Sequence, residues 1–395
     1  MPGRRARLRT CVAALLALVG TPGLATDATL DRRLSSFLAG GYEPLTVPVD
    51  WFDTDPVPGA PTPVETGPSA SVPPAVLEAA ATWAEKQDST ALIVAHRGRV
   101  VLERYWHGDG RDTRFNPQSM AKTLVALLVG QAIQRGEIKS VDDPLDAYIT
   151  EWRDDPRGRI TLRQSLQMAT GLGQIAGDYG YRVVPENPAV AQHFGADFLG
   201  PALKSPLKDA AGTKFDYNNN DVLLVTAALE RASGKPYRTL LSERLWKPLG
   251  LGNAAVYADK PGGTAMSSCC VFSRPVDWVR IGALIGGRGA WQGRQLVPAT
   301  WVDDMAKASP AYRGYGYYLW LGDQRVGGAT DYKIGLVPWA SEAFAAPTVF
   351  LYGHGQQRVW VVPSRDLVIV RTGRTWPKSW DESLLVNLVV RGMKP

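Results

Sequence analysis

Hydrophobic and polar positions change their spacing several times along this chain. Prolines recur from 47 to 74 and block helix and central strand alike, so we expect 26–74 to be an extended, proline-rich N-terminal segment. Residues 75–86 have helical spacing. The apolar runs 91–95 and 100–105 flank a glycine-containing turn, which predicts a β-hairpin.

The middle of the chain is mostly helical in pattern, with Leu- and Ala-rich stretches that end at glycines. The clearest of these stretches are 123–135, 162–169 and 222–232. After residue 262, helical spacing returns at 275–285, 298–308 and 381–390, and strand-like runs lie at 315–321, 358–362 and 367–371.

Strands near both ends of the chain, with helices between them, predict one antiparallel sheet that is flanked by helices and carries a large helical insertion. The expected fold class is therefore α/β plus all-α. We expect one domain over 75–395, with an α/β part at 75–118 and 261–395 and a helical part at 119–260.

The first 25 residues have the pattern of a secretory signal peptide. Four arginines lie between positions 4 and 9, an apolar run covers 11–20, and small residues stand at Gly23 and Ala25. We expect cleavage after Ala25 and a secreted or periplasmic mature protein. A retained membrane anchor is the alternative, although the apolar run is short for a bilayer span.

Composition and charge exclude several classes of function. The 395 residues are 45% hydrophobic and 21% charged, as in folded globular proteins. Removing the four arginines of the signal lowers the formal net charge from +6 to +2. With no dense Lys/Arg stripe, we expect no nucleic-acid partner. No later stretch of 18 apolar residues occurs, so we expect no stable membrane insertion after signal removal.

The spacing of the cysteines and histidines does not predict a metal site. The mature chain keeps the adjacent pair Cys269 and Cys270; a vicinal disulfide can form after export, but the pattern favours buried free thiols. The four histidines have no zinc-ligand spacing, and the Gly-x-Ser-x-Gly motif of α/β-hydrolases is absent. We expect no metal and no cofactor.

The first candidate for catalysis is the motif Ser119-Met-Ala-Lys122. A serine and a lysine three residues apart at the start of a helix share one face, and the serine N–H at the helix N-terminus can hold an oxyanion. The apolar helix that follows predicts a partly desolvated Lys122, whose neutral amine can act as a base. The alternative is a helix cap beside a solvated lysine. A second copy of the spacing, Ser205 to Lys208, is expected to lie in a loop.

Two further segments can contribute to the same site. Tyr217 and Asn219 lie on a turn before a helix, where Tyr217 near a lysine can relay a proton; the alternative is a turn of asparagines that caps the helix. His354, Gly355 and Gln356 precede a strand, where glycines allow close approach of a ligand and an N–H near Gln356 can complete an oxyanion hole. His354 itself is as consistent with a structural role as with a catalytic one.

These motifs, in this order and spacing, resemble the penicillin-recognising serine hydrolases. That family includes class C β-lactamases, D-alanyl-D-alanine carboxypeptidases, family VIII esterases and 6-aminohexanoate-dimer hydrolases. The resemblance covers most of 90–395 and extends to the segments 159–172, 245–251, 273–282 and 314–317. It implies a β-lactamase/transpeptidase-like fold with Ser119 as nucleophile, Lys122 as general base, Tyr217 as acid/base partner and Asn219 as a substrate-amide contact.

One departure from the family bears on the substrate. The Lys-Thr-Gly triplet of the lactamases is absent near residue 354, where Gly353-His354-Gly355-Gln356 stands instead. This resembles the esterase and 6-aminohexanoate-dimer hydrolase branch and disfavours efficient β-lactam hydrolysis. Tyr179 or Tyr181 lies where that branch can have a substrate-contacting loop tyrosine; surface packing is the alternative.

We therefore expect an exported serine hydrolase that cleaves a small ester, amide or short peptide through an acyl-enzyme on Ser119. β-Lactamase or D-alanyl-D-alanine carboxypeptidase activity is one alternative, and a non-catalytic binding protein on the same fold is another. Nothing in the sequence specifies the oligomeric state.

Overall fold

A computed structural model describes residues 27–43, 46–174, 182–184, 186–322, 338–375 and 380–394. The expected signal peptide, 1–25, lies outside these residues, so its cleavage stays a prediction. Among the helices of the described part, none combines the length and apolar character that a membrane span requires.

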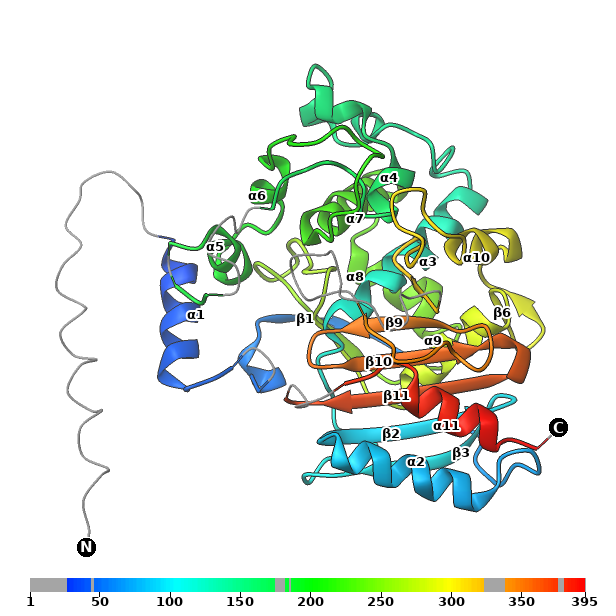
Figure 1. The fold of residues 1–395 in the computed structure, drawn as a ribbon. Coiled ribbons are helices and arrows are strands. Elements are labelled where there is room, and N and C mark those ends of the chain that lie inside the picture. The colour runs from blue at the N-terminus through cyan, green and yellow to red at the C-terminus, as the bar shows by residue number, and fades with distance from the viewer. Residues whose placement is uncertain are drawn as a thin grey trace, which may run out of the picture.

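A six-stranded antiparallel sheet with the order β3-β2-β11-β10-β9-β8 forms the base of the molecule (Figure 1). Strands from the two ends of the chain meet at its centre, where Ile93 of β2 lies opposite Val370 of β11. This confirms the expectation of one sheet built from both ends of the chain. The strands are β2 Ser89–His96, β3 Arg99–Tyr105, β8 Trp320–Leu321, β9 Val349–Gly353, β10 Gln357–Val362 and β11 Leu367–Gly373.

Helices cover both faces of this sheet, which explains why its central strands are apolar without alternation. Helices α2 (Pro74–Lys86) and α11 (Leu384–Gly392) lie on the face that is in front in Figure 1, and α9 (Asp277–Gly286) packs on β10 and β11 from the other face. The approach of α9 is close, since a β-carbon on Gly282 would lie 2.6 Å from Val368 Cγ1.

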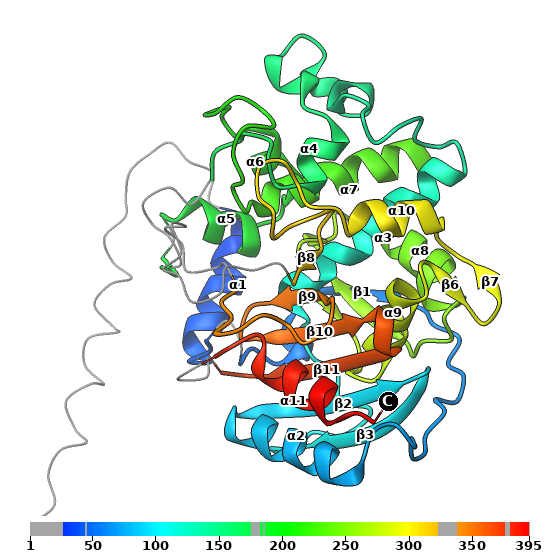
Figure 2. The same cartoon turned by 45° about the vertical axis from the view of Figure 1, so that its right-hand side comes forward.

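The helical part lies beyond the β9 and β8 edge of the sheet (Figure 2). Its centre is α3 (Lys122–Gln134), which contacts α7 (Asn219–Ser233) and is buried on all sides from Lys122 to Ala132. The apolar sequence of α3 predicted this burial. The remaining helices are α4 Leu162–Leu166, α5 Pro188–Phe194, α6 Leu199–Leu203, α8 Tyr237–Leu241 and α10 Ala299–Met305.

The N-terminal segment is folded onto the domain and is not extended throughout, so the expectation for 26–74 is wrong at residues 28–39. There, α1 (Ala28–Ala39) is a helix capped by the Asp27 carboxylate. The prolines that excluded a helix begin only at Pro44, and α1 buries Leu34 and Phe37 against α5. The guanidinium of the buried Arg33 donates to the carbonyl oxygens of residues 194, 195, 258 and 259.

Two smaller sheets complete the fold. One joins the N-terminal segment to the domain in the order β1-β4-β5, with β1 Thr54–Val57, β4 Ala254–Tyr257 and β5 Val271–Phe272. The other is a hairpin of β6 Ala290–Trp291 and β7 Arg294–Gln295.

The strand expectation at 315–321 holds only for Trp320 and Leu321. Tyr318 has a φ of 47°, which breaks the extended backbone just before β8. Strand β9 was not expected as a separate strand, because its apolar run is short and its glycine resembled the start of the next strand.

A pair of buried arginines supports the turn between β9 and β10. Arg358 on β10 forms a buried, two-point ion pair with Glu382. Arg371 on β11 donates to the carbonyl oxygens of Gly355 and Gln356 at 2.9 and 3.1 Å. Side chains of β10 and β11 therefore fix the turn of residues 354–356 through hydrogen bonds.

The buried ion pair should matter more for stability than the surface pairs. Replacing Glu382 by Gln leaves Arg358 buried without its counter-charge, so we expect the free energy of unfolding in urea to fall by about 3–5 kcal/mol. Glu78→Gln removes an exposed pair with Arg104 and should cost less than about 1 kcal/mol. Equal losses in the two variants would contradict this account.

Candidate active site

Ser119 lies on a 3-10 turn, Gln118–Ala121, that leads directly into α3. Ser119 is partly exposed as a residue, and its Oγ lies 2.8 Å from Lys122 Nζ. The turn packs against the end of β9 so closely that a β-carbon on Gly353 would lie 2.1 Å from the carbonyl oxygen of Pro117. Only glycine at position 353 lets the sheet edge approach the serine in this way.

Lys122 is buried, with 1% of its surface exposed, and is not the solvated lysine of a simple helix cap. Its Nζ lies 2.8 Å from the carbonyl oxygen of Ser268 and 5.0 Å from the centre of the Tyr217 ring. Burial lowers the pKa of Lys122 well below its ordinary value, because an ammonium loses its hydration there. The neutral amine can donate to the Ser268 carbonyl and accept from the Ser119 hydroxyl.

Tyr217 reaches the same place from the segment before α7. Its ring stacks on Trp320 at 5.8 Å and lies edge-on to Tyr315 at 6.2 Å, while its carbonyl oxygen accepts from Gln174 Nε2 at 2.7 Å. These contacts hold the ring beside the lysine amine. The fold thus brings together the serine, lysine and tyrosine that the sequence singled out.

Asn218 and Asn219, which follow Tyr217, differ in their contacts. Asn218 caps α7, since its Oδ1 accepts from the Asn220 N–H and its Nδ2 donates to the Leu172 carbonyl. Asn219 is the first residue of α7 and is exposed. The capping interpretation is therefore right for Asn218, and Asn219 keeps its side chain available to a ligand.

The turn His354-Gly355-Gln356 joins β9 to β10 at the sheet edge beside Ser119. Gln356 is buried, and its side-chain oxygen accepts from the Arg358 guanidinium, so this side chain supports the turn and does not face a ligand. His354 is half-buried, and burial lowers the pKa of its imidazole, which favours the neutral ring. A neutral His354 occupies the region where the lactamases carry a lysine.

The second Ser-x-x-Lys copy lies in a loop, as expected. Ser205 Oγ is buried and accepts from Asn220 Nδ2 at 2.8 Å, and Lys208 is exposed. Tyr179 and Tyr181 lie outside the described residues. Within the described ranges, no three His, Cys, Asp or Glu side chains form a group that could hold a metal ion.

The expectation of two free thiols is wrong, because Cys269 and Cys270 are joined by a disulfide. Neighbouring side chains point apart in an extended strand, but Cys270 has a φ of 64°, and this turn brings both sulfur atoms to one side. The disulfide directly follows Ser268, whose carbonyl contacts Lys122. Sequence reasoning missed this contact, since a backbone carbonyl carries no signal in the residue type.

Comparisons with known proteins identify the family. Residues 78–382 match the family model Beta-lactamase. Esterase EstB from Burkholderia gladioli is 29% identical over 187 residues, 43% of this chain and 47% of that protein. The D-alanyl-D-alanine-carboxypeptidase/endopeptidase AmpH from Escherichia coli K12 is 28% identical over 137 residues, 34% of each chain. The matched segment therefore spans less than half of each of these relatives.

A solved structure shows the same fold over nearly the whole chain. A Bacillus anthracis protein provisionally assigned as a 6-aminohexanoate-dimer hydrolase superposes with a TM-score of 0.70 and 17% identity, covering 94% of this chain and 96% of the other. The expected β-lactamase/transpeptidase-like fold is confirmed, and the relatives are named as hydrolases. This chain belongs to the Beta-lactamase family.

Proposed function

We propose that this protein is an exported serine hydrolase that cleaves an ester or amide bond through an acyl-enzyme on Ser119. The observation that carries the proposal is the 2.8 Å contact between Ser119 Oγ and the buried Lys122 Nζ. A partly exposed alcohol beside a desolvated amine is an activated nucleophile. A binding protein without activity has no need for a buried lysine beside a serine hydroxyl.

Acylation begins when Ser119 Oγ attacks the substrate carbonyl and the neutral amine of Lys122 takes the hydroxyl proton. The Ser268 carbonyl fixes one N–H of that amine, which directs its lone pair towards Ser119. The negative charge on the tetrahedral oxygen is stabilised by the Ser119 N–H, in the 3-10 turn that precedes α3, and by an N–H of the turn that follows Gly353.

Tyr217 completes the proton path. The centre of its ring lies 5.0 Å from Lys122 Nζ, and this proximity supports the assignment of the phenol as the group that passes the proton from Lys122 to the departing oxygen or nitrogen. Water then attacks the acyl-enzyme, and the same groups carry protons in reverse order. Asn219, exposed at the start of α7, can bind the substrate amide.

The chemistry beside the serine favours esters and neutral amides over β-lactams and D-alanyl-D-alanine peptides. Those substrates carry a carboxylate, and the neutral imidazole of His354 offers no positive charge for it. Carboxypeptidase activity remains the second candidate, because AmpH is among the similar proteins. The Cys269–Cys270 disulfide supports export, since such bonds persist in oxidising compartments.

Ser119→Ala should abolish covalent labelling by a fluorophosphonate and all ester hydrolysis, because the variant lacks the attacking oxygen. Intact-mass spectrometry measures the adduct. Ser205→Ala, in the loop copy of the motif, should keep full labelling. Retained labelling of Ser119→Ala, or unlabelled wild-type protein, would refute the acyl-enzyme.

The pH dependence should follow Lys122. Only the neutral amine is a base, so kcat/KM should rise with pH through the lowered pKa of Lys122 and level off well below its ordinary value of 10.5. Lys122→Ala should lower kcat/KM by about 10²- to 10⁴-fold and remove this rise. Lys208→Ala, a change at the exposed loop lysine, is the matched control. If Lys122→Ala lowers kcat/KM less than tenfold, Lys122 is not the general base.

A further inference from the structure

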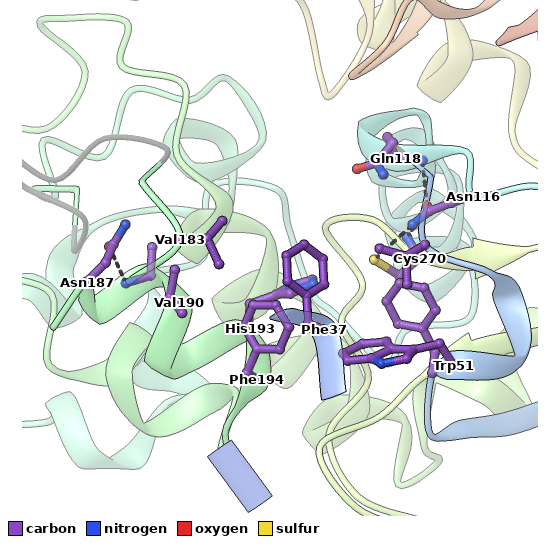
Figure 3. A pocket seen from close by; sticks show the side chains of 13 residues that line it. Phe37, Trp51, Asn116, Gln118, Val183, Asn187, Val190, His193, Phe194 and Cys270 are labelled. Atoms are coloured by element: carbon purple, nitrogen blue, oxygen red, sulfur yellow. Dashed lines mark hydrogen bonds between the residues drawn. The ribbon is translucent and has the colours of Figure 1, made fainter. Parts of the chain in front are cut away.

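An apolar pocket of about 200 Å³ lies beside the turn Gln118–Ala121, which carries Ser119 (Figure 3). Its aromatic walls are Phe37, Trp51, Phe52 and Phe194. Val183 and Val190 line the same space from the side that lies away from Trp51 in Figure 3. A cavity lined in this way gains free energy by taking apolar groups out of water.

The N-terminal segment builds a large part of this pocket. Phe37 comes from α1, and Trp51 and Phe52 come from the stretch between α1 and β1. All three precede residue 78, where the match to the family model begins. The pocket is therefore built jointly by the N-terminal segment and by residues of the family-matched region.

The pocket reaches the active site through three residues. Gln118 directly precedes the nucleophile, and Cys270 lies two residues after the carbonyl that contacts Lys122. Asn116 lies between them, because its Oδ1 accepts from the N–H groups of both Gln118 and Cys270. A group placed in the pocket is thus next to the segment that carries Ser119.

Tyr217 is not among the residues that line the pocket. The Tyr217 ring packs on Trp320 and Tyr315, and neither of these residues lines the pocket. Because Tyr217 protonates the leaving group in the proposed reaction, the leaving group departs on the Tyr217 side. The pocket is then left for the acyl side of the substrate.

The polar groups of the lining offer little to a charged ligand. Asn187 caps α5 through its Oδ1, and its Nδ2 donates to the Arg182 carbonyl. Burial, with the nearby charge of Arg33, lowers the pKa of His193 to about 4, so its ring is neutral at pH 7. A carboxylate in this pocket would lose its hydration without gaining a cation.

We propose that this pocket binds the acyl group of the substrate and selects uncharged, apolar acyl chains over short or anionic ones. The assignment rests on the proposed acyl-enzyme at Ser119, and it names the substrate class of that site.

The test uses p-nitrophenyl esters with acyl chains of two, four, six and eight carbons, and a hemisuccinate ester as the anionic probe. We expect kcat/KM to rise about threefold for each added methylene until the pocket is full. The hemisuccinate should react at least tenfold more slowly than the butanoate.

Two leucine variants on α5 make the test specific. Ala189 lines the pocket, so Ala189→Leu should lower kcat/KM at least tenfold for the hexanoate and less than twofold for the acetate. Ala191→Leu is the same change outside the pocket lining and should keep the wild-type profile. A flat profile, or equal profiles for the two variants, would overturn the pocket assignment while fluorophosphonate labelling of Ser119 still supported the hydrolase. Absence of both labelling and hydrolysis would instead refute the proposed function.

A second observation, independent of the pocket volume, concerns the disulfide. The Ser268 carbonyl that precedes it lies 2.8 Å from Lys122 Nζ, and the Cys270 N–H donates to Asn116 Oδ1 at 3.3 Å. Asn116 Oδ1 also accepts from the Gln118 N–H at 2.9 Å. The disulfide segment therefore contacts the base on one side and the turn of the nucleophile on the other.

We infer that the Cys269–Cys270 disulfide is a positioning element, which holds the Ser268 carbonyl against the Lys122 amine. Cys269 is half-exposed, so a small dithiol can reach it. Reduction by dithiothreitol transfers two electrons and two protons, converts the bond to two thiols and leaves the reductant as a cyclic disulfide. The released segment then no longer fixes the lysine.

Reduced and desalted wild-type protein, kept free of oxygen, should be labelled by the fluorophosphonate at least tenfold more slowly than oxidised protein. The acid limb of its labelling rate should move to lower pH, because a carbonyl that accepts from an ammonium stabilises the charged form. The double variant Cys269→Ser/Cys270→Ser should show the slower labelling and the shifted acid limb without reductant. Adding dithiothreitol to this variant should change neither. An unchanged rate, or a loss with an unmoved acid limb, would overturn the positioning role.

Discussion

The arrangement of the active site depends on the burial of one amine. Lys122 stands at the first turn of a helix that is buried on all sides, so its nitrogen cannot keep the water that an ammonium needs. Burial therefore favours a neutral lysine under conditions where lysines are normally charged. This neutral amine lies 2.8 Å from the serine oxygen, where it can act as a base. The apolar core of the helical part is thus a condition of the chemistry.

The second partner of the site is the edge of the sheet. Gly353 allows this edge to approach the serine turn, and the guanidinium groups of Arg358 and Arg371 hold the chain just beyond it. Buried charges of this kind contribute little net stability, since their desolvation offsets their attraction. Their role is to fix the backbone of a turn whose N–H groups face the reacting carbonyl in the proposed mechanism.

The N-terminal segment lies before the family-matched region and packs against it. Helix α1 does not belong to the family-matched region, yet it packs on α5 and contributes Phe37 to the pocket beside the turn that carries Ser119. Arg33 joins this helix to the domain through four backbone carbonyls. In the proposed assignment, the residues that line the pocket contact the acyl group of the substrate.

The sequence by itself predicted the helices and strands with strong spacing and the main sheet made from both chain ends, and it singled out Ser119, Lys122 and Tyr217 as candidate catalytic residues. Such features follow from local patterns and from side chains with distinctive chemistry. Only the tertiary structure decided that residues 28–39 form a helix, that Cys269 and Cys270 are bonded, and that the Ser268 carbonyl meets Lys122. The helix packs on a distant segment, the disulfide needs a local backbone turn at Cys270, and the lysine contact is made by a backbone carbonyl, which no residue type reveals.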